Sequence, residues 1–391
     1  MKKILFIIPL ILLLTGCYNY REINELAIVS GISITKEGND IKLTTEVINP
    51  KKEQDASSGE EPEFITYTKK AKSIQEAIRK MIQESPRKMY GAHIEILIID
   101  EKIAKKDLMD ILDFFARDPE IRSEFKVLIG KNDDILKITT PLEKISSQNI
   151  RDSLENNSKY LGYANVVTYH ELISNVLNPN KELVLPVISL KGNQKEGEEK
   201  ENISDTANKA NPYLSGMAIF KNNQLKGYLT EKEELTYNML TNEAKNFFIR
   251  TNNKDNQYVV HKIIHFSSKM EFNKKAKEIE IILKGNAAIA EVNEKIDLEN
   301  LNEVSNLEKE LNKELKKTVE DSIQKIKNKY NSDIFGFRDL IYKTDPKYYK
   351  EINKDWYKGI FQNIKVNVKV EVKGKEKGSL NRGVYQWKKI N

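Results

Sequence analysis

The chain contains a single cysteine, Cys17, and this limits the ways in which its fold can be stabilised. One cysteine cannot form an internal disulfide, and it excludes a cysteine-rich metal centre. Only four histidines are present, which leaves little material for a histidine-built metal site. The fold must therefore rest on apolar cores, and a hydrophobic share of 39% over 391 residues is sufficient for them. A chain of this length has room for two or three domains.

The cysteine ends the most apolar stretch of the chain. Lys2 and Lys3 form a basic start, residues 4–14 are nearly all apolar, and Leu14-Thr15-Gly16-Cys17 follows. The run is shorter than the roughly 20 residues that a membrane-spanning helix needs, and it is typical of a secretory signal. Its end resembles a bacterial lipobox, so we expect residues 1–16 to be a cleaved signal peptide and Cys17 to carry diacylglycerol and palmitate. An ordinary signal peptide with an incidental cysteine is the alternative.

Turn signals and changes of periodicity divide the rest of the chain into three mixed units of strands and helices. We expect an N-terminal unit over residues 17–135, a middle unit over 136–240 and a C-terminal unit over 241–391. The first unit opens with a predicted hairpin, because residues 27–34 and 41–48 are rich in β-formers and a turn-forming segment separates them. Together these patterns predict an α+β (mixed α/β) fold.

Two segments of the later units have distinctive compositions. Residues 191–211 are charged and polar and almost free of large apolar side chains, which predicts a mobile loop. Residues 297–330 carry apolar side chains about 3.56 positions apart, which predicts a long amphipathic helix. We expect Leu311, Leu315 and Val319 on that helix to face a sheet containing the alternating valines of residues 366–370. Docking of the helix on a partner is the alternative.

The sequence contains few candidate residues for catalysis or metal binding. His261 and His265 lie in a β-rich segment, where they would stand about 13 Å apart on one strand face, so no metal site is expected. The acidic clusters at residues 60–63 and 196–199 are expected to be solvated surface, and so are the lysines of the C-terminal strand, although contact with anionic lipid is an alternative for these. No phosphate-binding loop or nucleophile elbow is present. We predict no enzyme activity, no cofactor and no metal, and the small net charge of +6 does not indicate nucleic-acid binding.

Three segments together resemble the Ger(x)C family, the C subunits of bacterial spore germinant receptors. They are residues 17–32, which continue directly from the lipobox; residues 216–229, which begin Gly-Met-Ala-Ile-Phe; and residues 346–356 with the strand 366–372 after them. They follow the order and spacing of the family, so the resemblance covers essentially the whole chain. Tyr18 departs from the tryptophan that family members often have after the lipid-bearing cysteine.

The resemblance implies three domains, each a β-sheet flanked by α-helices, and a non-enzymatic lipoprotein subunit needed for nutrient-triggered germination. It implies two integral-membrane partners, the A and B subunits, and a location on the outer face of the cytoplasmic membrane, in the inner membrane of the dormant spore. The family supplies no catalytic motif, only Cys17 as the lipid site. A solute-binding lipoprotein feeding a membrane transporter is the alternative, although that class usually has two similar lobes of repeated βα units.

Overall fold

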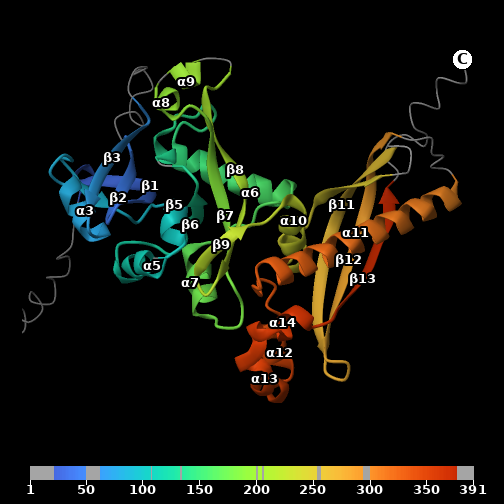
Figure 1. Cartoon of the computed structure of the whole chain (residues 1–391). Helices are drawn as coiled ribbons and strands as arrows, with labels where there is room; N and C mark the ends of the chain where they lie inside the picture. Colours follow the sequence, from blue (N-terminus) through green and yellow to red (C-terminus); the bar gives the residue numbers. More distant parts are fainter. Residues whose placement is uncertain are drawn as a thin grey trace, which may run out of the picture.

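The computed structural model describes residues 22–49, 62–106, 108–132, 134–199, 201–204, 207–252, 257–293 and 300–376. The signal peptide, Cys17 and the C-terminal residues from 377 onward lie outside these ranges. The described chain builds two β-sheets flanked by helices, which confirms the expected mixed α/β class (Figure 1).

The first sheet has nine strands, in the order β3-β2-β1-β5-β6-β7-β8-β9, with β4 paired to the start of β1. The strands β1, β5, β6 and β7 run parallel to one another, and antiparallel hairpins complete both ends of the sheet. Their bounds are β1 (Leu26–Glu37), β2 (Asp40–Ile48), β3 (Phe64–Ala71), β4 (Lys88–Tyr90), β5 (Ile96–Asp100), β6 (Lys126–Gly130), β7 (Val184–Gly192), β8 (Ala210–Lys221) and β9 (Gln224–Tyr228).

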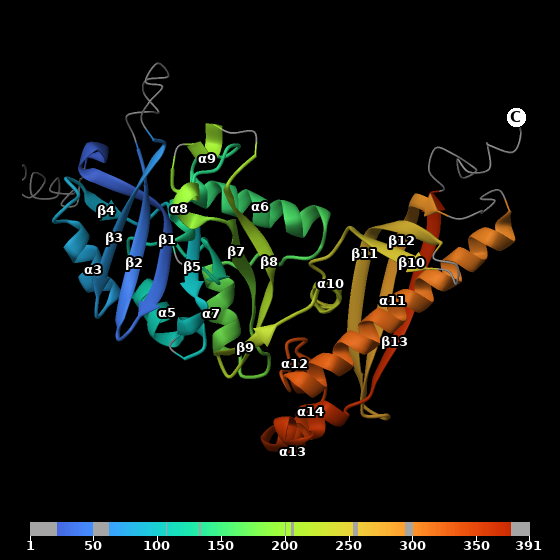
Figure 2. The same ribbon diagram turned by 45° about the horizontal axis from the view of Figure 1, so that its top comes forward.

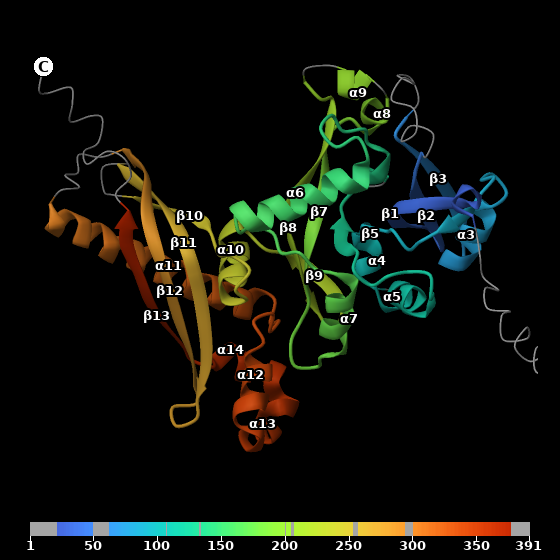
Figure 3. The ribbon, with the colours of Figure 1, turned by 180° about the vertical axis from the view of Figure 1, so that it is seen from behind.

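Helices cover both faces of the central parallel strands. On β5, Ile96 and Ile98 pack with the helix α6, whereas Leu97 and Ile99 face the helices of the opposite side. This explains why β5 is a continuous apolar run, since a strand buried on both faces has no polar side. Figure 3 shows α6 crossing the back of the sheet. The helices here are α3 (Ile74–Met81), α4 (Glu101–Ala104), α5 (Leu108–Arg117), α6 (Ser146–Tyr160) and α7 (Tyr169–Leu177).

This sheet crosses the expected boundary between residues 135 and 136. The strands β6 and β7 lie on opposite sides of that boundary and pair in parallel, with Ile129 opposite Val187 and Gly130 opposite Ile188. Residues 17–135 and 136–240 therefore contribute strands to one sheet and do not build two separate ones. β8 and β9 form a hairpin, and its turn residues Asn222 and Asn223 have the positive φ angles that such two-residue turns require.

Residues 191–211 were expected to form a mobile loop, and the described part of this segment contains regular secondary structure. β7 extends to Gly192, two short helices, α8 (Gln194–Gly197) and α9 (Glu201–Ser204), follow, and β8 already begins at Ala210. Asn202 is fully buried, and its amide binds the carbonyl oxygens of Thr139 and Ala210 and the N–H of Ala210. Hydrogen bonds to a buried amide thus hold a segment whose apolar content is too low to do so.

The second sheet has the order β10-β11-β12-β13 and lies beside the first (Figures 1 and 2). The long amphipathic helix α11 covers one of its faces, as predicted. Leu311, Leu315 and Val319 are buried in the same core as Val368 and Val372 of β13. The bounds are α10 (Glu231–Leu240), β10 (Phe247–Asn252), β11 (Tyr258–Asn273), β12 (Glu278–Asn293), α11 (Leu301–Lys329), α12 (Phe337–Thr344), α13 (Pro346–Ile352), α14 (Ile360–Asn363) and β13 (Val366–Glu376).

α11 also protects the free edge of this sheet. β13 pairs with β12 on one side, which leaves alternate backbone groups pointing away from the sheet. Asn312 on α11 donates to the carbonyl oxygen of Val372 and accepts from its N–H, at 2.9 Å in both cases, and Glu308 accepts from the N–H of Gly374 at 3.0 Å. An uncovered edge strand invites pairing with another chain, so these side chains close part of the edge.

Candidate functional site

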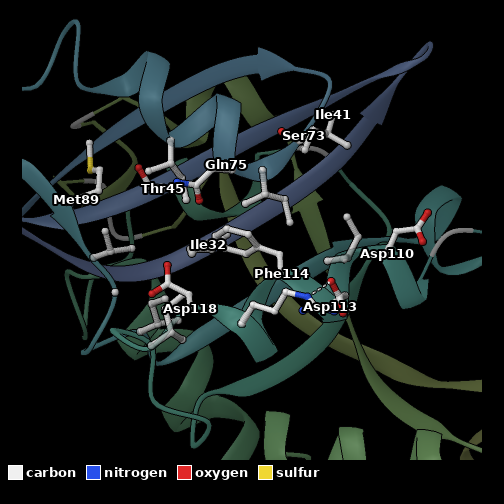
Figure 4. A pocket seen from close by; sticks show the side chains of 18 of the residues that line it. Ile32, Ile41, Thr45, Ser73, Gln75, Met89, Asp110, Asp113, Phe114 and Asp118 are labelled. Carbon is white, nitrogen blue, oxygen red and sulfur yellow. Dashed lines mark hydrogen bonds and ion pairs between the residues drawn. The ribbon is translucent and has the colours of Figure 1, made fainter.

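A groove with a volume of about 840 Å³ lies over the β1–β2 hairpin, between α3 and α5. Figure 4 shows it from close by. The floor comes from cross-strand neighbours on the two strands, Ile32 opposite Thr45 and Lys36 opposite Ile41. Because paired residues of adjacent strands share one face of a sheet, the hairpin register places these four side chains under the same groove.

The two helices form the walls. α3 starts at Ser73, whose side chain accepts the N–H of Glu76 at 3.2 Å, so this hydroxyl is engaged as a helix cap. α5 buries an apolar stripe of Leu108, Ile111, Leu112 and Phe115. Its Phe114 is only partly buried and lines the groove, and Figure 4 shows the ring reaching toward Ile32 and Gln75.

Charged side chains surround the apolar centre of the groove. Three cations on its rim belong to ion pairs. Lys72 pairs with Asp40 at 2.6 Å, Lys88 with Glu120 at 2.7 Å, and Arg117 with Asp113 on the same helix at 2.7 Å. The fourth lining cation, Lys36, has a partner as well. No histidine or cysteine is among the lining residues. An apolar centre with a few polar groups around it is typical of a binding site.

A second polar cluster joins the two sheets. Asp333, in the turn after α11, is fully buried and accepts the backbone N–H groups of Gly336, Phe337 and Arg338. Burial raises the pKa of its carboxyl to about 7, against the opposing effect of these three hydrogen bonds. The N–H of Glu182, just before β7, donates to the carbonyl oxygen of Asp333, and Tyr357 donates to the Glu182 carboxylate at 2.9 Å. This cluster holds the segments around β7 and α11 together.

The histidines do not share one face of the strand. β11 contains a register shift between Ile264 and Ser267, and His265 has a φ of 51°. The expectation that His261 and His265 lie on one face is therefore wrong, because the bulge turns His265 to solvent while His261 remains buried and bonds to Thr251 at 3.0 Å. Burial lowers the pKa of His261 to about 4. Within the described ranges, no group of three or more His, Cys, Asp or Glu side chains could hold a metal ion.

The other predicted surface groups have mixed placements. Cys17 and the glutamates at positions 60 and 61 fall outside the described residues, whereas Glu196, Glu198 and Glu199 are all exposed, as expected. On β13, Lys369 and Lys373 are exposed, as a solvated strand face requires. Of the helices that the structure describes, none combines the length and apolarity needed to cross a bilayer. The groove was not predicted, although Phe114, which lies outside the apolar stripe of α5, was a signal for it.

Comparisons with known proteins cover nearly the whole chain. Residues 19–190 match the family described as spore germination protein N-terminal domain, and residues 215–378 match the family described as spore germination B3/GerAC like, C-terminal. The chain belongs to the Ger(x)C family of spore germination proteins.

Full-length relatives and a crystal structure agree with this membership. The chain is 29% identical to spore germination protein KC of Bacillus subtilis (strain 168), over 89% of this chain and 88% of that protein. It is 23% identical to spore germination protein GerQC of Bacillus cereus, over 87% and 90% of the two chains. The crystal structure of the GerBC protein superimposes with a TM-score of 0.51 and 16% identity, covering 88% of this chain and 96% of that one, which shows a shared fold.

Proposed function

We propose that this Ger(x)C protein is a non-enzymatic, lipid-anchored subunit of a spore germinant receptor, needed for germination triggered by nutrients. The observation that carries the proposal is the match of both family domains, in order, to residues 19–190 and 215–378. Spore germination proteins B3 and A3 of Bacillus subtilis (strain 168) are among the further relatives. Integral-membrane A and B subunits are the proposed partners.

The proposed anchor is Cys17 at the end of the lipobox. A diacylglycerol on its thiol supplies two acyl chains, and two chains hold a protein stably on a bilayer where one chain does so only marginally. The protein would lie on the outer face of the cytoplasmic membrane, which becomes the inner membrane of the dormant spore. The segment between Cys17 and β1 is short, so the first sheet would stay close to that membrane.

Metabolic labelling with a fatty-acid analogue tests the anchor. Wild-type protein should be labelled, and Cys17→Ala should be unlabelled and less well retained on membranes. Equal label in the two proteins would contradict acylation at Cys17. Deletion of the chain should abolish the response of spores to at least one nutrient, and expression of the wild-type protein should restore it. An unchanged response to every nutrient tested would contradict the receptor role.

A further inference from the structure

The groove between α3 and α5 has the size and lining of a site for a small organic molecule. Its volume of about 840 Å³ falls in the range of roughly 300–1,000 Å³ that is typical of such sites. Ile32 and Ile41 provide an apolar floor and Phe114 an aromatic wall, and all three come from rigid strands or helices. An aliphatic or aromatic group of a ligand would find apolar surface on both sides here.

The charges on the rim determine the polar part of that ligand. The cations that line the groove are already engaged with other groups. Two lining carboxylates, Asp110 and Asp118, have no cationic partner among the described residues. In the described part of the chain, the Asp118 carboxylate accepts a single hydrogen bond, from the N–H of Glu120 to its Oδ1 at 2.9 Å. Figure 4 places Asp110 and Asp118 on opposite sides of Phe114.

An apolar cavity flanked by two unneutralised carboxylates attracts a positively charged group attached to an apolar body. A protonated amine can donate charge-assisted hydrogen bonds to a carboxylate, and its cation can also approach the face of Phe114. A carboxylate or phosphate on the ligand would instead meet like charge. We propose that this groove binds a small organic ammonium compound, with its apolar body over Ile32 and Phe114 and its amine at Asp118 or Asp110. This goes beyond the proposed function, because it requires neither the lipid anchor nor a partner subunit.

Three probes of matched shape test the ligand class. They are 2-phenylethylamine, 2-phenylethanol and 3-phenylpropanoate, which place an ammonium, a neutral hydroxyl and a carboxylate on the same aromatic body. Each is titrated by ligand-observed NMR against the chain from residue 17 onward, carrying Cys17→Ser so that no acyl chain binds the probes. Saturable binding of the amine, at least about tenfold tighter than that of the other two, is expected; tenfold corresponds to about 1.4 kcal/mol.

Variants locate the binding. Asp118→Asn and Asp110→Asn together should reduce the affinity for the amine to that for the alcohol, and Phe114→Ala should weaken both. Asp339→Asn is the matched control, because Asp339 pairs with Lys343 on α12, and it should change nothing. Since Asp118 also supports a turn, Asp110→Asn alone is measured too, and circular dichroism checks each fold. Equal affinity for amine and alcohol, amine binding unchanged in the double variant, or no saturable binding of any probe would each overturn the proposal.

Discussion

Truncation of Leu315 tests how α11 is attached to the second sheet. The Leu315 side chain is fully buried in the core that contains Val368 and Val372 of β13. Its replacement by alanine removes three buried carbon atoms and leaves a cavity that a helix packed on a sheet cannot close. Substitutions of this kind cost about 2–5 kcal/mol. We expect a value in the upper half of that range for Leu315→Ala, because α11 is packed at this point both against β13 and beside the buried Thr318 and Val319.

Lys316 is the matched control, one position further along the same helix. Its side chain is about half exposed and lies 3.8 Å from Glu320 in a surface ion pair. Such pairs contribute little, so Lys316→Ala should change the free energy of unfolding by no more than about 0.5 kcal/mol.

Urea unfolding followed by tryptophan fluorescence measures both variants. Trp356 is buried in the same core as Leu315, and replacing Trp387 by Phe leaves it as the one reporter. The full chain must be used, because this core also contains Val184, Met217 and Ile219 of the first sheet. A cost for Leu315→Ala below 1 kcal/mol, or a larger cost for Lys316→Ala, would refute the assigned packing face. Normal stability together with loss of germination would instead make α11 a docking surface for a partner.

Buried polar side chains in three places should contribute measurably to the stability of the fold. Asn312→Ala leaves both backbone groups of Val372 without their partner and should cost about 1–3 kcal/mol in urea unfolding. Asn202→Ala should cost a similar amount, since it removes three hydrogen bonds from a buried site. Burial raises the pKa of Glu46 to about 7, from 4.5 when unfolded, so the folded state retains a proton that the unfolded chain releases. Stability should therefore fall as the pH rises from about 4.5 to 7, and Glu46→Gln should reduce this dependence.

Exposed amide and carboxylate side chains serve as controls for these three buried ones. Asn328→Ala on α11 removes only an exposed contact with Gln324 and should be nearly neutral. Gln194→Ala, which loses an exposed contact with Glu198, is the control for Asn202→Ala and should also be nearly neutral. Glu371→Gln, on the solvated face of β13, is the control for Glu46→Gln and should leave the pH dependence of stability unchanged. Costs for the controls as large as for their buried counterparts would show that the hydrogen bonds named here do not carry the effect.

The periodicity of apolar residues correctly predicted the helices and strands that bury one apolar face. The 3.56-residue spacing of residues 297–330 located α11, and the alternation of residues 366–370 gave the face of β13 that meets it. Both predictions succeed because side chains buried on one face of a helix or strand recur in the sequence at the period of that element. The pairing of β6 with β7 has no such signal in the sequence, because the two strands are far apart in the chain and the paired part of each is a continuous apolar run.

Hydrogen bonding and backbone irregularities explain the errors. Composition measures how much apolar surface a segment can bury, and it gave no sign that the amide of Asn202 would bind the backbone of Thr139 and Ala210. The bulge at His265 inverts the side-chain alternation of β11, and the strand contains no glycine or proline from which a bulge could be predicted. The groove arises from the spacing of α3 and α5 over the hairpin, which is a property of tertiary packing. The position of Phe114 outside the apolar stripe of α5 was a signal in the sequence, but by itself it could not locate the groove.

Affinity purification from the membranes of dormant spores tests whether this chain is a receptor subunit. A tagged copy of this chain would be solubilised in mild detergent and the recovered proteins identified by mass spectrometry, with an untagged strain as the control. We expect an integral-membrane A subunit and an integral-membrane B subunit to be recovered together with the tagged chain in comparable amounts. Recovery of the chain without either membrane protein, from membranes in which both are present, would contradict its assignment as a receptor subunit.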